Sequence, residues 1–166
     1  PMAGHSWANG AANAADGNNQ ESSSEAVNFA AGLILWGDAT GNDELRDLGI
    51  FIYANETAAT QQYWFDIDGA VRQHGPSANG RTTPWITNGI VWGAKGTAVT
   101  YFGASAACVV GINLLPFTGG SLYLGQSPSH VQAVYDQVAT AYDAFRCWAP
   151  LAGTDTPPPP AGADDW

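Results

Sequence analysis

The sequence predicts a mainly α-helical domain in which helical hairpins are joined by long loops. Apolar residues recur at helical spacing in two stretches, 22–36 and 43–65, which only a short loop separates. A further stretch that starts at Pro128 has the clearest helical face. The segments between them are rich in glycine, asparagine and tryptophan, which is typical neither of a doubly wound sheet nor of a β-sandwich.

The composition is that of one globular domain. The 166 residues are 45% hydrophobic and 12% charged, and a chain of this length buries roughly two-thirds of its unfolded surface. Fifteen acidic against five basic residues give a net charge of −10, which argues against a nucleic acid or an anionic membrane as partner. Glycine, asparagine or aspartate interrupts the apolar stretches before the ~20 residues of a membrane span.

The first predicted helix covers Ser22 to Trp36. Its apolar residues lie on nearly every side, which is typical of a helix buried among others. The sequence Gly37-Asp38, followed by Thr40-Gly41-Asn42, is expected to end this helix.

The second predicted helix covers Asp43 to Phe65. Asp43 and Glu44 lie in its first turn, where the helix dipole favours negative charge. Because the loop before it is short, we expect the first two helices to pack as an antiparallel pair.

The remaining chain alternates between turns and shorter elements. Residues 1–20 and 66–83 are predicted to be loops, 85–92 has the composition of a short strand, and 93–96 is expected to form a turn. A helix is expected over 99–115, although Gly103 and Gly111 weaken it, and 118–120 ends it.

The last helix is predicted to begin with Ser127 as its cap and Pro128 at its first position. One face of this helix carries Val131, Val134, Tyr135, Val138, Tyr142, Phe145 and Trp148.

The densest polar cluster, Asp16 to Glu25, leads into the first helix. Glu21 and Glu25 are four residues apart, so within a helix their Cβ atoms would lie roughly 5–6 Å apart on one face. Paired carboxylates in different surroundings suit acid–base chemistry. Alternatively, Ser22 caps the helix and Glu25 completes a capping box, a structural role. Both interpretations stay open.

Other polar and aromatic residues favour a sugar ligand less directly. His5 and Trp7 lie on a glycine-flanked loop that either faces a ligand or plugs the core. Flat aromatic faces beside amide and hydroxyl groups suit sugar rings, although most tryptophans are buried in cores. The aromatic residues with such neighbours are Trp7, Trp64, Trp85, Trp92 and Tyr101.

Three histidines and two cysteines lack the spacing of a metal site, and there is no serine-hydrolase elbow or phosphate-binding loop. Cys108 and Cys147 either form one disulfide of an exported protein or are buried thiols.

Several blocks of this sequence resemble family 81 of the glycoside hydrolases, the endo-β-1,3-glucanases. The resemblance covers about residues 3 to 148 in the order of the family. The blocks are Gly4-His5-Ser6-Trp7-Ala8, residues 16–26 (DGNNQESSSEA), Tyr63-Trp64-Phe65-Asp66, residues 89–93 (GIVWG), residues 111–116 (GINLLP) and residues 118–125 (TGGSLYLG).

The resemblance implies a catalytic region folded as an (α/α)6 toroid, preceded by a β-sandwich. It implies hydrolysis of internal β-1,3-glucosidic bonds with inversion, without a metal or other cofactor. Glu21 matches the family's general base and Glu25 a neighbouring essential acidic position. His5, Trp7, Asn18, Gln20 and Trp92 are the candidate substrate contacts.

The chain departs from the family pattern in one respect, because no segment matches the one that carries the family's general acid. We therefore expect residues 1–152 to be the C-terminal part of the catalytic domain, a partial toroid that lacks the acid. Residues 153–166, with Pro157 to Pro160 and two acidic residues, are expected to be a Pro-rich acidic linker. An upstream catalytic region and a downstream accessory domain would complete the protein.

The sequence thus predicts part of a secreted, extracellular enzyme. Its expected partner is β-1,3-glucan, as laminarin, curdlan or fungal cell-wall glucan, with no nucleic acid and no membrane. Two alternatives stay open: a non-catalytic β-glucan-binding helical module, and a purely structural half-toroid in which Glu25 is only a cap.

Overall fold

The computed structural model describes residues 19–69, 86–92 and 96–140. In chain order the elements are β1 (Asn19–Gln20), α1 (Ser23–Thr40), α2 (Asp43–Ala59), the π-helical turn η1 (Thr60–Trp64), β2 (Ile90–Trp92), β3 (Gly96–Thr97), α3 (Ala106–Leu114), the 3-10 helix η2 (Gly119–Gln126) and α4 (Pro128–Thr140). The prediction of a mainly helical protein is confirmed. The predictions for the first 18 residues, for 70–85 and for the tail lie outside the described residues.

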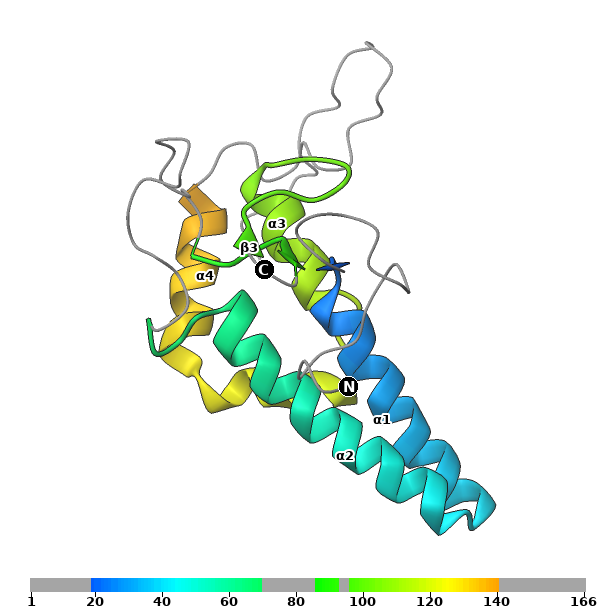
Figure 1. Cartoon of the computed structure of the whole chain (residues 1–166). Coiled ribbons are helices and arrows are strands. Elements are labelled where there is room, and N and C mark those ends of the chain that lie inside the picture. The colour runs from blue at the N-terminus through cyan, green and yellow to red at the C-terminus, as the bar shows by residue number, and fades with distance from the viewer. Residues whose placement is uncertain (1–18, 70–85, 93–95, 141–166) are drawn as a thin grey trace, which may run out of the picture.

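Helices α1 and α2 form the predicted hairpin, whose tip points away from the other elements (Figure 1). Helix α1 was expected to end near Gly37, but it continues to Thr40 and is closed by Gly41 at a φ of 68°. Gly37 serves the packing instead, because a Cβ there would lie 2.4 Å from the backbone nitrogen of Arg46 on α2.

The expectation that α1 is buried on nearly every side is wrong for the described part of the chain. Val27, Ala30 and Gly37 are buried, but Phe29, Leu35 and Trp36 are each more than 60% exposed. The buried residues face α2 and the core, whereas the exposed ones carry an apolar surface along the hairpin.

The second predicted helix appears as α2 continued by η1, which ends within one residue of the expected position. The π-helical turn shifts the helix register at its end and is followed by Asp66 at a φ of 47°, an unusual conformation for a residue other than glycine. Trp64, the last residue of η1, is fully buried, so the core interpretation holds for this tryptophan.

A small antiparallel sheet has the strand order β1-β2-β3. Asn19 pairs with Trp92, and Ile90 pairs with Thr97. The strand expected over 85–92 is limited to Ile90–Trp92. Its partner strands are residues 19–20, expected in a loop, and Gly96–Thr97, of which Gly96 was expected in a turn.

The last third of the chain differs from prediction in two places. Helix α3 starts at Ala106 rather than near 99, because residues 100–103 close into a separate turn. The 3-10 helix η2 follows the predicted break and was not foreseen. Helix α4 begins at Pro128 as expected, with Val134 buried on its inner face.

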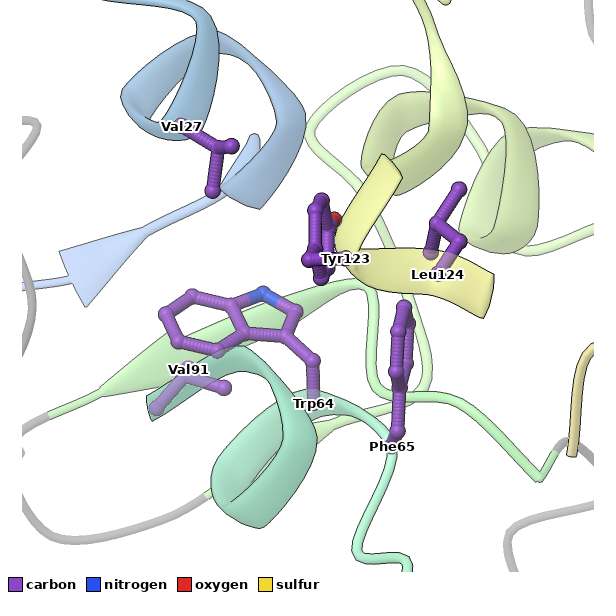
Figure 2. Close-up of a cluster of buried hydrophobic side chains, with 6 residues drawn as sticks. All are labelled: Val27, Trp64, Phe65, Val91, Tyr123 and Leu124. Carbon is purple, nitrogen blue, oxygen red and sulfur yellow. The ribbon is translucent and has the colours of Figure 1, made fainter. Parts of the chain in front are cut away.

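One cluster of buried side chains joins these elements (Figure 2): Val27, Trp64, Phe65, Val91, Tyr123 and Leu124. It draws α1, η1, β2 and η2 onto a common core, so the start of α1 is fixed against the sheet. Among the described residues, no single helix is long and apolar enough to cross a membrane, and α3 with η2 passes that test only as a pair bent by 116°.

Candidate active site

Glu21 lies at the junction of β1 and α1. It follows the last strand residue, Gln20, and precedes the helix cap, Ser22. Its side chain is partly exposed, and its Oε1 accepts a hydrogen bond of 2.6 Å from the backbone N–H of Tyr101. A residue 80 positions away in sequence therefore fixes one oxygen of this carboxylate.

Asn113 anchors the start of α1 to α3. Its Oδ1 accepts from the backbone N–H of Ser23 at 3.1 Å and from the Ser23 hydroxyl at 2.9 Å. Its Nδ2 donates to the carbonyl oxygens of Asn88 at 2.8 Å and Val109 at 3.1 Å. This fully buried amide thus uses both of its N–H groups and receives two donors.

The two neighbouring serines make parallel contacts. The hydroxyls of Ser22 and Ser24 donate to the carbonyl oxygen of Ile112 at 2.9 and 3.1 Å, and Ser24 also bonds to the carbonyl of Leu115. These carbonyls lie at the C-terminal end of α3, where helix carbonyls lack intrahelical partners. The serine run after Glu21 therefore fastens two helix ends together and gives Glu21 a rigid support.

Glu25 lies in the first turn of α1 with its side chain exposed. Its backbone N–H donates to the Ser22 hydroxyl at 3.1 Å, which confirms Ser22 as the cap. No donor to the Glu25 carboxylate is found among the described residues, so the return bond of a capping box is missing there. Glu21 precedes the helix, so the helical spacing expected for this pair does not apply.

Of the other predicted site residues, two lie in the described part of the chain and three do not. Gln20 is 4% exposed and its Nε2 donates to the Ser22 carbonyl at 3.2 Å, so its amide faces the protein. Trp92 is half-buried on β2, opposite Asn19. His5, Trp7 and Asn18 lie outside the described residues.

Sequence reasoning missed two features of this site. It did not pair Tyr101 with Glu21, because no local pattern links residues so far apart. It recognised the block around Asn113 but not its role as an anchor. Cys108 is disulfide-bonded, which decides between the two interpretations for this cysteine. Cys147 lies outside the described residues.

The arrangement suits the handling of a proton by a fixed carboxylate. The Tyr101 amide holds one oxygen of Glu21, and the partly exposed side chain leaves the carboxylate open to a ligand or a water. A general base needs such a position within hydrogen-bond reach of the proton it accepts. Within residues 19–69, 86–92 and 96–140, no group of three or more His, Cys, Asp or Glu side chains is placed to hold a metal ion.

Comparison with known proteins agrees with this architecture. The glycosyl hydrolase family 81 C-terminal domain matches residues 2–149. The chain therefore belongs to glycoside hydrolase family 81, as the resemblance in its motifs predicted.

Individual relatives have been described from bacteria and yeast. A glucan endo-1,3-beta-D-glucosidase of Acetivibrio thermocellus is 43% identical over 138 residues, which are 83% of this chain and 17% of the relative. The enzyme of the same name from Thermobifida fusca is 41% identical over 84% of this chain and 18% of its own length. A primary septum glucan endo-1,3-beta-D-glucosidase of Schizosaccharomyces pombe is 34% identical over 80% of this chain and 12% of its own.

A solved structure has the same fold. A family 81 glycoside hydrolase from Clostridium thermocellum superimposes with a TM-score of 0.71 at 42% identity, covering 81% of this chain and 18% of that chain. The chain thus spans less than a fifth of the length of these relatives.

Proposed function

We propose that this chain supplies the general base of an endo-β-1,3-glucanase that cleaves internal β-1,3-glucosidic bonds with inversion. The observation that carries the proposal is the Glu21 carboxylate, held by the Tyr101 amide at the start of α1. Membership of family 81 supports the substrate class, since the relatives above are named glucan endo-1,3-beta-D-glucosidases.

In this mechanism Glu21 holds a water molecule beneath the anomeric carbon and accepts one of its protons as the water oxygen forms the new bond to carbon. The glucosidic bond breaks at the same time, and a second carboxyl group, about 6.5–9.5 Å away in inverting enzymes, gives its proton to the leaving oxygen. Glu25 helps to orient this water. The general acid belongs to another part of the catalytic domain, since no segment of this sequence resembles the one that carries it in the family.

The wider setting is part of the same proposal. The helical hairpins form part of an (α/α)6 toroid, and residues 153–166 are a linker to an accessory domain. The enzyme acts outside the cell on laminarin, curdlan or fungal cell-wall glucan. His5, Trp7, Asn18 and Trp92 contact the substrate, whereas the buried amide of Gln20 supports the start of α1 instead.

The test is the release of reducing ends from laminarin by the native protein that contains these 166 residues, with cellulose as control. Release from laminarin alone supports the proposal. A folded native protein that binds laminarin but releases nothing would instead be the non-catalytic glucan-binding module.

A further inference from the structure

The turn that reaches Glu21 is closed by its own hydrogen bonds. The backbone N–H and the hydroxyl of Thr100 donate to the carbonyl oxygen of Gly103 at 2.7 and 2.8 Å. The Gly103 N–H in return donates to the Thr100 hydroxyl at 3.0 Å. Thr100 is buried at 7% exposure, while Gly103 is half-buried, so these contacts lie partly inside the protein.

The same turn is fastened to α3. A Cβ on Gly103 would lie 2.8 Å from the sulfur of Cys108, so the turn packs directly on this disulfide-bonded residue. The Ser105 hydroxyl donates to the same sulfur at 3.2 Å. Helix α3 therefore supports both the turn at 100–103 and, through Asn113, the start of α1. Glu21 is connected to both: its carboxylate bonds to Tyr101 in the turn, and its backbone leads directly into α1.

Tyr101 projects from this fixed turn. Its backbone N–H bonds to Glu21, yet its side chain is 62% exposed, and the neighbouring Phe102 is 44% exposed. Single exposed aromatic residues are common on protein surfaces. This pair differs because the backbone N–H of Tyr101 bonds to the candidate base, so an exposed aromatic side chain belongs to a residue in direct contact with the carboxylate.

We propose that Tyr101 is a glucan-contacting residue whose ring stacks on a glucosyl unit bound beside Glu21, while its backbone N–H positions the carboxylate. A tyrosine suits this role because it combines a flat apolar ring with a polar hydroxyl at its tip. This proposal rests on the proposed function, since it names the residue that binds that substrate.

The stacked unit is the neighbour of the one that reacts, and stacking on a unit that does not react stabilises the bound substrate and the transition state equally. Loss of the ring therefore raises KM and leaves kcat nearly unchanged. The positioning bond comes from the backbone, so a side-chain substitution keeps it. The two contributions of Tyr101 are separable for that reason.

The experiment measures kcat and KM for laminarin hydrolysis by the native protein and its variants. Tyr101→Ala is expected to raise KM about tenfold, as the loss of one aromatic stacking contact implies, with kcat within about threefold of the parent. Tyr101→Phe keeps the ring and is expected to retain the parent KM. Tyr135→Ala, which removes a 45% exposed tyrosine from α4, is the matched control and leaves KM unchanged.

Two results would overturn the proposal. One is an unchanged KM for Tyr101→Ala. The other is a Tyr101→Ala variant that loses kcat and melting temperature but keeps its KM, with both losses restored in Tyr101→Phe, because the ring would then have only a structural role. Tyr101→Leu repeats the test if the alanine variant does not fold. Failure of the proposed function looks different, because the parent protein would then release nothing from laminarin.

Discussion

Glu21 and Glu25 are four residues apart in the sequence, but the fold holds them differently. Glu21 precedes α1 and accepts a backbone hydrogen bond from Tyr101, whereas Glu25 lies in the first helical turn with its carboxylate exposed. The structural work at this helix end falls to the serines between them. Ser22 in particular caps the helix and bonds to Ile112.

Substitutions at Ser22 and Glu25 separate the cap from the carboxylate. Ser22→Ala is expected to destabilise the protein by about 1–2 kcal/mol, because the cap is lost. Glu25→Gln loses only a charge near the helix N-terminus, about 0.3–1 kcal/mol. Urea unfolding measures both variants. An equal loss for both would mean that Glu25 has a structural partner.

For single residues, the sequence predicts contacts between neighbours in the chain and misses contacts between distant residues. The serine and glutamate pattern predicts the Ser22 cap, because capping depends on neighbouring residues. Glu21 as the base follows from the resemblance to family 81 and stays a prediction. The contacts of Glu21 with Tyr101 and of Ser23 with Asn113 span 80 and 90 positions. They depend on how the helices pack, which no local pattern contains.

Among the elements, the α1–α2 hairpin depends on two glycines where the helices approach each other. A Cβ on Gly37 would lie 2.4 Å from the Arg46 nitrogen, and one on Gly49 would lie 2.8 Å from the Ile34 nitrogen. Both neighbours are backbone atoms that cannot rotate away. The helices can pack this closely only because these positions lack side chains.

We predict that Gly37→Ala destabilises the protein by about 1–3 kcal/mol, because one helix must move to admit the methyl group. Gly32→Ala on the same helix is the control. A Cβ there meets nothing within 4 Å, so this variant should gain up to about 1 kcal/mol from higher helix propensity. Thermal unfolding compares the two, and equal effects would contradict the close approach.

Element boundaries show why periodicity alone is insufficient. Gly37 looks like a helix end in the sequence, but it is a packing position within the helix. Residues 99–105 fit a helical pattern, yet the hydroxyl of Thr100 competes for the backbone and forms a turn. By contrast, Pro128 and the loop at 41–42 mark their boundaries correctly, because their backbone preferences are local.

On the scale of the whole molecule, the core contains an ionisable group. Burial raises the pKa of Tyr123 to about 12, and the nearby Ser23 hydroxyl offsets part of that rise. Burial likewise raises the pKa of Tyr53, whose hydroxyl donates to the Gly120 carbonyl at 2.8 Å. Both residues favour the neutral phenol in the folded protein.

Stability should therefore fall in alkaline solution. An unfolded tyrosine has a pKa of about 10, so the contribution of Tyr123 is complete below about pH 10 and is lost as the pH rises toward 12, by roughly 2–3 kcal/mol. Urea unfolding at about pH 9 and about pH 11.5 measures this loss. Tyr123→Phe should remove most of the pH dependence and Tyr53→Phe a smaller part. If Tyr123→Phe loses as much stability between these two pH values as the parent does, Tyr123 is not the titrating group.

The exposed side of the hairpin has a second consequence for the molecule. Phe29, Leu35 and Trp36 lie uncovered on α1, and large apolar patches favour association. In a toroid, neighbouring helices would cover them. We predict that the 166-residue chain self-associates in sedimentation and that Trp36→Lys weakens this association. A monomer with a sharp thermal transition would count against the prediction.

The role of Glu21 as general base is tested by comparing Glu21→Gln with the parent in the native protein, by the rate at which reducing ends appear in laminarin. The amide oxygen of glutamine still accepts the Tyr101 N–H, so the melting temperature should change little. The loss of a general base should lower kcat about a hundredfold or more. If activity stays within about tenfold of the parent, Glu21 is not the base.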